Sequence, residues 1–561
     1  MREEGKEERI CTKCGYKEDR IISATHVHEY NQKIETAEYL KQEASCSEKA
    51  VYYYSCKCGK KGEETYEFGE ELGHDEIEHE GKGATCTEVG YNAYVTCSRC
   101  EYSTHEEIAA LEHSYSLEWT IDVEATYDNV GSKSYHCVRE NCDAKACVTE
   151  IPMLAYSQGL EYELNATQDE YMVKGIGTCK DTEIDIPALY NNLPVTSIGF
   201  EAFKDCALIS SVKIPSSVKQ IEAYAFYNCS SLENIEIQLG VECVEHYAFG
   251  QCTSLINIVI PDSVTLIGDR VFSECTSLKN ITLSNALKST AMYTFYNCTA
   301  LESIEIPTGI ETIGDFAFRG CSKLSSVMLP NTITKIGTNA FSNCASLEGI
   351  DLPDSINTIC DDAFSGCAKL TSIVIPKNVV LIDDFTFLNC TSLSSVVIPK
   401  NVQRIGVSAF NGCSNLKNID LPSELKTIGN YAFYNCVSLE SIEIPNTVTE
   451  VGYSVFMSCT ALKNVKLSSS LKSISIRMFD SCTNLASIEI PASVKSIENY
   501  AFNGCTKLVS IVIPSTVETV GYHVFLNCTL QINCEVASLP SKWDVDWNSS
   551  NCNVNWGYIK K

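Results

Sequence analysis

Long apolar stretches and basic residues are both scarce in this sequence. No segment approaches eighteen uninterrupted apolar residues, so none is expected to cross a bilayer as a helix. Lysine and arginine number 43 against 72 aspartates and glutamates, which gives a formal net charge of −29 at pH 7. Nucleic acids and anionic lipids are both bound through clustered basic side chains. The sequence therefore predicts no nucleic-acid partner and no membrane insertion.

Catalytic motifs are missing as well. The sequence has no nucleophile elbow, no phosphate-binding loop, no H-E-x-x-H pattern and no paired carboxylates outside a repeating pattern. Only two of the nine histidines, His246 and His523, lie beyond residue 150, so no cysteine–histidine dyad is indicated there. We expect the protein not to be an enzyme and to carry no catalytic cofactor.

Cysteine, by contrast, is abundant, and fifteen of the 31 cysteines recur every 23 residues from Cys206 to Cys528. A phenylalanine lies three residues before each of them, from Phe203 to Phe525. A leucine follows three residues later in thirteen of the fourteen complete units. One such unit cannot bury its apolar face alone, so stacked units are expected to share one continuous core. We expect the repeated cysteines to be buried thiols that act as small apolar residues.

The unit 321–344 illustrates the expected path of the chain. Val327 has polar neighbours, as on a short strand with one buried face. Pro330 ends the pairing of that strand because it has no N–H group. Phe341 and Cys344 then follow at helical spacing. Each unit is thus predicted to be a strand, a turn and a helical or 3₁₀ return, with the strands side by side in a parallel sheet.

The pattern L-x-x-I-x-I-P-x-S-V-x-x-I-G-x-x-A-F-x-x-C resembles that of BspA-like leucine-rich repeats, over residues from about 160 to 535. The resemblance implies an α/β leucine-rich-repeat solenoid with a parallel β-sheet on the concave face, preceded by small Cys-rich β modules. It implies an irregular first coil over 158–205, repeats over 206–528 and a terminal cap over 529–561. Trp543, Trp547 and Trp556 are expected to cover the end of the core. A secreted or cell-surface location and a role in attachment are also implied.

Eleven cysteines and seven histidines precede residue 150, in modules that repeat with a period of about forty residues. We place the modules at 1–43 (partial), 44–83, 84–124 and 125–157 (degenerate). They resemble a short Cys-rich repeat of large surface proteins of gut bacteria, of the form A-T-C…C-x-x-C-G…A-L-G-H. The partial module begins midway, with Cys11 and Cys14 followed by His26 or His28, and no secretory leader precedes it. The sequence is therefore expected to be an amino-terminal truncation.

Three cysteines and one histidine in a module can hold one tetrahedral zinc ion. The expected structural zinc ligands form two sets: Cys46, Cys56, Cys58 and His74, and Cys86, Cys97, Cys100 and His113. The alternative is that the thiols are oxidised outside the cell and form disulfides. A module this small needs one or the other, because its core is too thin to fold unaided. The last module has Tyr127 and Ala155 where the first cysteine and the histidine would fall, so it is expected to bind nothing.

Two exposed columns are expected on the sheet. The residue five positions after each cysteine is almost always serine or asparagine, which suits either a polar ladder along the sheet or a strip for a glycan or an extended protein. The residue seven positions after the cysteine varies between acidic and apolar types, as on a surface free of packing constraint or merely solvated. The candidate ligand-binding residues in that column are Glu305, Met328, Asp351, Val374, Val397, Asp420, Glu443 and Glu489.

The expected function is that of a surface or secreted adhesion protein that binds a protein or a glycan on another cell or matrix. Mixed apolar and acidic side chains would suit a protein partner with basic and apolar groups. No aromatic row is expected on the sheet face, which weakens the case for sugar stacking. The alternative is a structural spacer of the cell envelope without a specific ligand, because fold alone does not separate the two roles.

Overall fold

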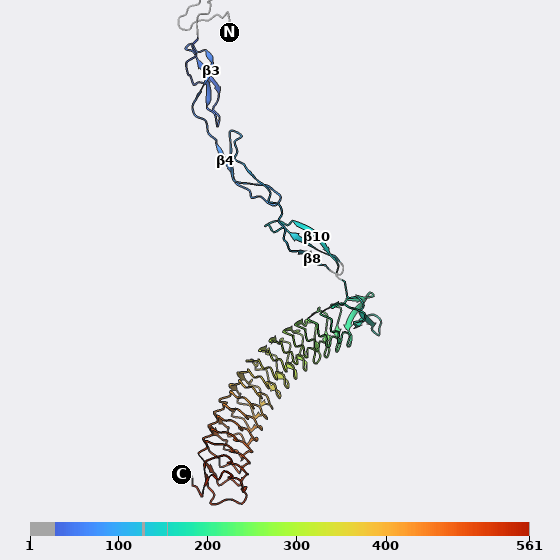
Figure 1. The fold of residues 1–561 in the computed structure, drawn as a ribbon, viewed down its shortest axis with the longest axis vertical. Helices are drawn as coiled ribbons and strands as arrows, with labels where there is room; N and C mark the ends of the chain where they lie inside the picture. Colours follow the sequence, from blue (N-terminus) through green and yellow to red (C-terminus); the bar gives the residue numbers. More distant parts are fainter. Residues whose placement is uncertain (1–27, 126–128, 154, 560–561) are drawn as a thin grey trace, which may run out of the picture. The chain divides into compact units, whose positions relative to one another are not determined.

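The computed structural model describes residues 28–125, 129–153 and 155–559, and it divides into two units, Met1–Leu154 and Ala155–Lys561 (Figure 1). Cys11, Cys14, His26 and Tyr127 lie outside the described residues. Strands and turns make up the described part of the chain, which contains no helix and so none able to cross a membrane.

The first unit consists of small antiparallel sheets in chain order. Its strands are β1 (Leu40–Gln42), β2 (Ala50–Ser55) and β3 (Lys61–Phe68); β4 (Glu76–His79) with β6 (Tyr94–Cys97); β5 (Gly90–Tyr91) with β7 (Glu107–Ile108); and β8 (Thr120–Val123), β9 (Gly131–His136) and β10 (Lys145–Ile151). Few side chains of this unit are buried, and most of the buried apolar ones are cysteines and tyrosines. Each sheet therefore has only a thin core, as the modules' size predicts.

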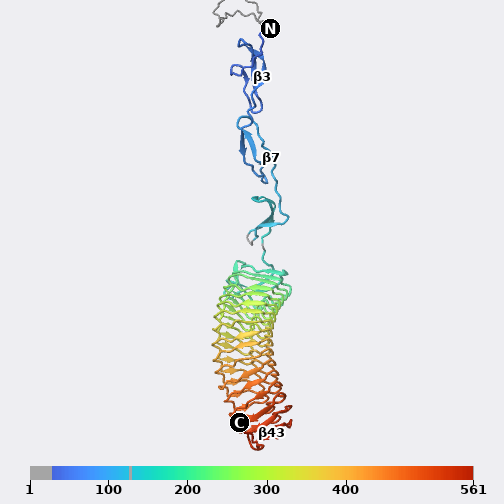
Figure 2. The same cartoon turned by 90° about the vertical axis from the view of Figure 1, so that its left-hand side faces the viewer.

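The second unit is a solenoid whose turns follow one another in chain order, from green to red in Figures 1 and 2. Most turns contribute one short strand to each of two rows, and neighbouring strands of a row pair in parallel, as Ser303 does with Ser326 and Thr312 with Lys335. The unit opens on β11 (Glu161–Leu164), β12 (Tyr171–Gly175) and β14 (Leu189–Tyr190). The expected leucine-rich-repeat solenoid of parallel strands is confirmed.

We name the two rows A and B. Row A comprises β13 (Glu183–Asp185), β16 (Ser211–Ile214), β18 (Asn234–Ile237), β20 (Asn257–Val259), β22 (Asn280–Thr282), β24 (Ser303–Glu305), β26 (Ser326–Met328), β29 (Ser372–Val374), β31 (Ser395–Val397), β34 (Ser441–Glu443), β36 (Asn464–Lys466), β38 (Ser487–Ile488), β40 (Ser510–Ile513), β42 (Gln531–Cys534) and β43 (Asn553–Trp556). Row B comprises β15 (Leu193–Ile198), β17 (Gln220–Ile221), β19 (Cys243–Val244), β21 (Leu266–Ile267), β23 (Ser289–Thr290), β25 (Thr312–Ile313), β27 (Lys335–Ile336), β28 (Thr358–Ile359), β30 (Leu381–Ile382), β32 (Arg404–Ile405), β33 (Thr427–Ile428), β35 (Glu450–Val451), β37 (Ser473–Ile474), β39 (Ser496–Ile497) and β41 (Thr519–Val520).

The core of the solenoid is a set of columns that run from turn to turn. All fifteen repeat phenylalanines, Phe203 to Phe525, are fully buried, and the rings of adjacent turns stack with centroids 5.0 to 5.8 Å apart. The repeat cysteines from Cys229 to Cys528 are buried beside them, whereas Cys206 in the first turn is only partly buried. Burying one phenylalanine contributes about 1.5–3 kcal/mol, so the column is a major part of the stability of each turn.

Over the described repeats the expected helical or 3₁₀ return is absent, and the backbone shows why. In the turn that ends at Cys344, Asn339 and Asn343 adopt left-handed conformations, with φ of 55° and 61°. The N–H groups of residues 339, 341 and 343 donate to carbonyls of the following turn, while those of 340, 342 and 344 donate to the carbonyl three residues earlier. An α-helix needs every N–H to donate four residues back. The return is therefore a ladder of tight turns bonded to its neighbour rather than a helix.

The carboxyl end of the core is closed by tryptophans. Trp543 and Trp547 are buried at 5% exposure, and the ring of Trp547 lies edge-on to Phe525 at 6.1 Å. Trp556, on β43, is partly buried against both. A solenoid needs such a lid because its last turn has no neighbour to cover its apolar side.

Candidate binding face and candidate metal centres

The candidate ligand-binding residues form one column on the outer side of row A, which we call the strand face. All eight are exposed, five of them on strands and Asp351, Asp420 and Glu489 in turns without an assigned strand at that position. The pattern is clear on β24, where Ile304 points inward at 4% exposure and Glu305 points outward. Glu305 pairs with Met328 of the next turn, so residues 23 positions apart are direct neighbours.

Large apolar side chains on this face are open to solvent. Met328, Val374 and Val397 are 64%, 61% and 52% exposed, and Val374 pairs directly with Val397. Glu443 is engaged differently, because its Oε1 atom forms an ion pair with Nζ of Lys466 at 2.5 Å. Lys466 occupies the same column one turn later, and the acidic and apolar residues chosen from the sequence did not include it.

The serine and asparagine column beside it forms some bonds along the sheet. Asn280 donates to Oδ1 of Asn257 at 2.7 Å, and Ser441 donates to Oδ1 of Asn418 at 3.3 Å. The polar-ladder interpretation therefore holds for these pairs.

The cysteines and histidines of the first unit gather in three groups. Centre 1 consists of Cys46, His74, Cys97 and Cys100; centre 2 consists of Cys86, His113, Cys137 and Cys142; the partial centre consists of His28, Cys56 and Cys58. Within each group the candidate ligand atoms all lie within 4.8 Å of one another. The sulfur atoms of Cys46 and Cys97 are 3.5 Å apart, and those of Cys86 and Cys137 are 3.7 Å apart.

This grouping differs from the two sets expected from the sequence. Cys46 and His74 lie with Cys97 and Cys100 of the following module, not with Cys56 and Cys58. Cys86 and His113 lie with Cys137 and Cys142, although the module 125–157 was expected to bind nothing. The reason is the pairing of β4 with β6, which brings Cys97 opposite Glu76, two residues after His74. Sequence proximity within a module is thus overridden by a hairpin that crosses the module boundary.

The solenoid has recognisable relatives. The model of the BspA type leucine rich repeat region matches residues 196–324, 288–417 and 405–532, which together span more than half of the sequence. The chain belongs to this family.

Two solved structures are similar to this chain. A leucine-rich repeat protein from Bacteroides ovatus is 26% identical with a TM-score of 0.50, over 72% of this chain and 99% of that one. A leucine rich cell surface protein from Faecalibacterium prausnitzii is 28% identical with a TM-score of 0.35, over 56% of this chain and 94% of that one. No curated protein matches the chain.

This BspA-type solenoid also carries an aromatic column that the sequence reasoning missed. Five residues before the repeat cysteines, the rings of Tyr224 and Tyr247 stack at 4.8 Å and those of Tyr293 and Phe316 at 4.4 Å. The guanidinium of Arg270 lies between them, 5.4 Å from the Tyr247 centroid and 3.9 Å from that of Tyr293. All five are partly exposed, and each has a positive φ. Reading the column five residues before the cysteine would have found it.

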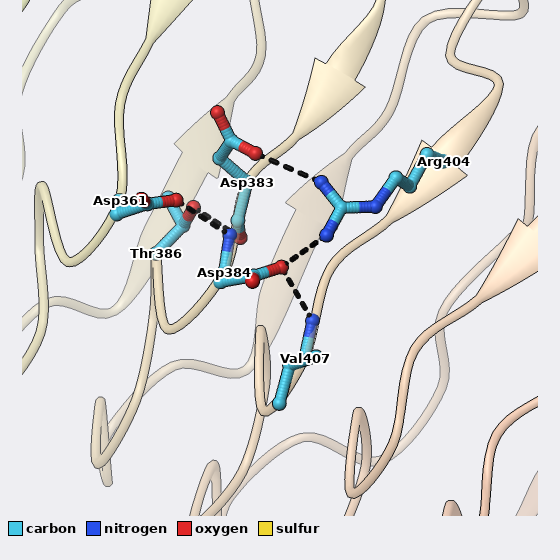
Figure 3. A network of polar contacts seen from close by, with 6 residues as sticks. All are labelled: Asp361, Asp383, Asp384, Thr386, Arg404 and Val407. Atoms are coloured by element: carbon cyan, nitrogen blue, oxygen red, sulfur yellow. Dashed lines mark hydrogen bonds and ion pairs between the residues drawn. The ribbon is translucent and has the colours of Figure 1, made fainter.

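Acidic residues beside row B have a structural role (Figure 3). Asp384 accepts the N–H of Val407 at 2.8 Å and also pairs with the guanidinium of Arg404. Arg404 reaches Asp383 as well, at 2.9 Å. The N–H of Asp384 in turn donates to Asp361 at 3.1 Å. The carboxylates of Asp361 and Asp384 thus each accept a backbone N–H of the following turn at an edge that is partly exposed, so we assign them a structural role.

The thiols of the repeat cysteines are unreactive because they stay protonated. Burial raises the pKa of Cys275, Cys321, Cys390 and Cys459 to about 12, and that of Cys344 well above its ordinary value. A protonated, buried thiol is neither a nucleophile nor a metal ligand. The column therefore serves packing, as the sequence predicts.

Proposed function

We propose that this protein is a non-catalytic, secreted or surface-attached binding protein that takes a protein or glycan partner on the strand face. The observation that carries the proposal is the exposure of Met328, Val374 and Val397 in a column that also holds Asp351 and Asp420. Exposed apolar groups flanked by charge are typical of interaction surfaces. The similar structure from Faecalibacterium prausnitzii is that of a leucine rich cell surface protein, which supports the location.

The chemistry of this column favours a partner with basic and apolar groups. Acidic side chains in the column, such as Asp351 and Asp420, would steer a basic surface towards the protein, and the exposed apolar groups would supply most of the buried area. The metal inferred for the Cys-rich modules below has a structural role, and the binding role does not depend on it.

The spacer alternative is supported by a different observation. Part of the polar column bonds to itself along the sheet, as between Asn257 and Asn280, and so leaves fewer groups for a ligand. A surface whose polar groups pair internally is what a spacer needs. The experiment below separates the two roles.

The test is capture by the full chain on a glycan array and on a panel of purified extracellular proteins. V374D/V397D is expected to reduce capture at least tenfold, and D351K/D420K to reduce it in a salt-dependent way. The matched control is L266D/L381D, which places the same charges on exposed leucines of row B. Capture that both strand-face variants leave unchanged would overturn the proposal. No capture by the wild type from either panel would favour the spacer.

A further inference from the structure

We infer that centre 1 and centre 2 each hold one structural Zn²⁺ ion, and that the ion joins one Cys-rich module to the next. Three cysteine sulfurs and one histidine nitrogen form each centre. This ligand set is one of the standard tetrahedral zinc sets, and thiolate-rich sites favour zinc over the harder divalent cations. The inference is independent of the partner that the solenoid binds.

The distances between the ligand atoms fit a metal ion at the middle. Zn–S bonds of about 2.3 Å and Zn–N bonds of about 2.0–2.1 Å place tetrahedral ligand atoms about 3.8 Å apart for two sulfurs and about 3.6 Å apart for sulfur and nitrogen. In centre 1, Cys46 and Cys97 are 3.5 Å apart, and Cys100 Sγ lies 3.4 Å from Nδ1 of His74. In centre 2, Cys142 Sγ lies 3.3 Å from Nδ1 of His113.

The same distances argue against disulfides. A disulfide needs two sulfurs about 2.05 Å apart and has no use for a third sulfur or for an imidazole. Each centre brings an odd number of sulfurs together and aims the Nδ1 atom of a histidine at one of them. Only a shared ion uses all four groups.

Backbone bonds hold the ligands of each centre in the same way. In centre 1 the N–H of Leu72 donates to Ser45, the residue before Cys46, at 3.0 Å, and Glu76 pairs with Cys97. In centre 2 the N–H of Leu111 donates to Thr85, the residue before Cys86, at 2.9 Å, and Tyr115 pairs with Cys137. The first contact lies within one module and the second reaches the next. Each centre is therefore assembled at the junction of two modules.

A matching arginine closes each junction. Arg99, two residues after Cys97, donates to the carbonyl of Gly73 at 3.0 Å, next to His74. Arg139, two residues after Cys137, donates to the carbonyl of Glu112 at 3.1 Å, next to His113. Both arginines tie the turn that carries the histidine to the segment after the first cysteine that the following module contributes to that centre. Such outer contacts fix the orientation of a metal ligand.

The backbone also supports the ligand sulfur of Cys97. The N–H groups of Asp75 and Arg99 both donate to Sγ of Cys97 at 3.4 Å. Hydrogen bonds to a sulfur stabilise its thiolate form, which is the form that binds metal. Because Asp75 precedes and Arg99 follows the junction, these bonds again come from two modules.

The test uses the full chain, purified under reducing conditions, reconstituted with zinc and dialysed, with metal content measured by mass spectrometry. The double variants separate the two groupings of ligands. C46S/C97S removes two ligands of centre 1 only and is expected to lose one zinc relative to the wild type. C86S/C97S removes one ligand from each centre and is expected to lose two. Ligand sets confined to single modules predict the reverse order.

Two further measurements keep the result interpretable. C147S, which removes an exposed cysteine outside all three groups, is expected to lose no metal. Replacing zinc with Co²⁺ is expected to give the absorption of tetrahedral sulfur-rich sites, and C46S/C97S is expected to reduce this absorption without abolishing it, because centre 2 still folds. The inference is overturned if the reduced wild type binds no zinc, if iron is retained in its place, or if C86S/C97S loses only one ion.

Discussion

The thiol of Cys344 donates a hydrogen bond of 3.2 Å to the backbone carbonyl of Phe318 in the preceding turn. The same bond recurs along the column, from Cys229 with Phe203 to Cys528 with Phe502, both at 3.0 Å. The column thus combines small apolar volume with a weak second donor to a carbonyl that already accepts an N–H of its own turn, as Phe318 accepts that of Cys321 at 3.1 Å. Alanine could supply neither the volume nor the donor.

Alkaline pH is expected to destabilise the solenoid through these thiols. An unfolded cysteine loses its proton near pH 8.5, whereas burial raises the pKa of Cys321 to about 12. Between those values the unfolded state binds fewer protons than the folded state, so stability falls as pH rises. C321A lacks one of these thiols, so its free energy of unfolding should fall less steeply with pH, by about 1.4 kcal/mol per pH unit. Urea unfolding from pH 8 to pH 11 measures it, and an unchanged slope in C321A would contradict the expectation.

The repeat core could be predicted from residue identity, because Phe341 and Cys344 recur without a gap and have only the interior to occupy. The absence of a helical return could not be predicted. Its apolar spacing also fits a ladder of turns, and the deciding feature is the positive φ of Asn339 and Asn343. Asparagine at one such position signals a helix end; left-handed residues at both, four apart, exclude the helix.

Substitution of Gly366 is expected to destabilise the solenoid. Its φ is 74°, and a Cβ atom there would collide with Oδ1 of Asn343 in the preceding turn. G366A should therefore lower the free energy of unfolding by about 1–2 kcal/mol for the left-handed backbone, with the collision in addition. N343G/G366A removes the colliding Oδ1 atom, so it should regain the part of the free energy of unfolding that the collision costs. The control is G349A, whose Cβ atom would meet nothing within 4 Å, and denaturant unfolding compares all three.

Asp384 is expected to stabilise the edge of row B through its oxygen acceptor. D384A removes the acceptor for Val407 N–H and the partner of Arg404, at a cost of about 1.5–3 kcal/mol. D384N keeps an acceptor and should cost less, because Asn430 accepts the N–H of Tyr453 at 3.0 Å in the equivalent position. D351A on the strand face is the matched control. Equal losses in D384A and D384N would show that the charge, not the backbone bond, matters.

The candidate metal centres mark the limit of sequence reasoning at the amino end. Three cysteines and a histidine could be recognised as a candidate ligand set. Their grouping could not, because it depends on the pairing of Glu76 with Cys97 and of Tyr115 with Cys137. Those pairs join positions about twenty residues apart, and the spacing within each module gives no sign of them.

Acid is expected to loosen the sheet of β8, β9 and β10 through Asp122, whose side chain is 6% exposed. Hydrogen bonds from Lys145, then Ser134 and His136, lower the pKa of this carboxyl. Because this pKa is lowered, the carboxylate stabilises the folded state above about pH 4, and that stabilisation is lost as pH falls further. D122N should therefore speed hydrogen exchange in β9 at pH 7, and the difference from the wild type should shrink towards pH 3. E124Q, a change at an exposed position just after β8, should neither speed exchange at pH 7 nor show this pH dependence. If D122N exchanges like the wild type at pH 7, the carboxylate does not hold this sheet.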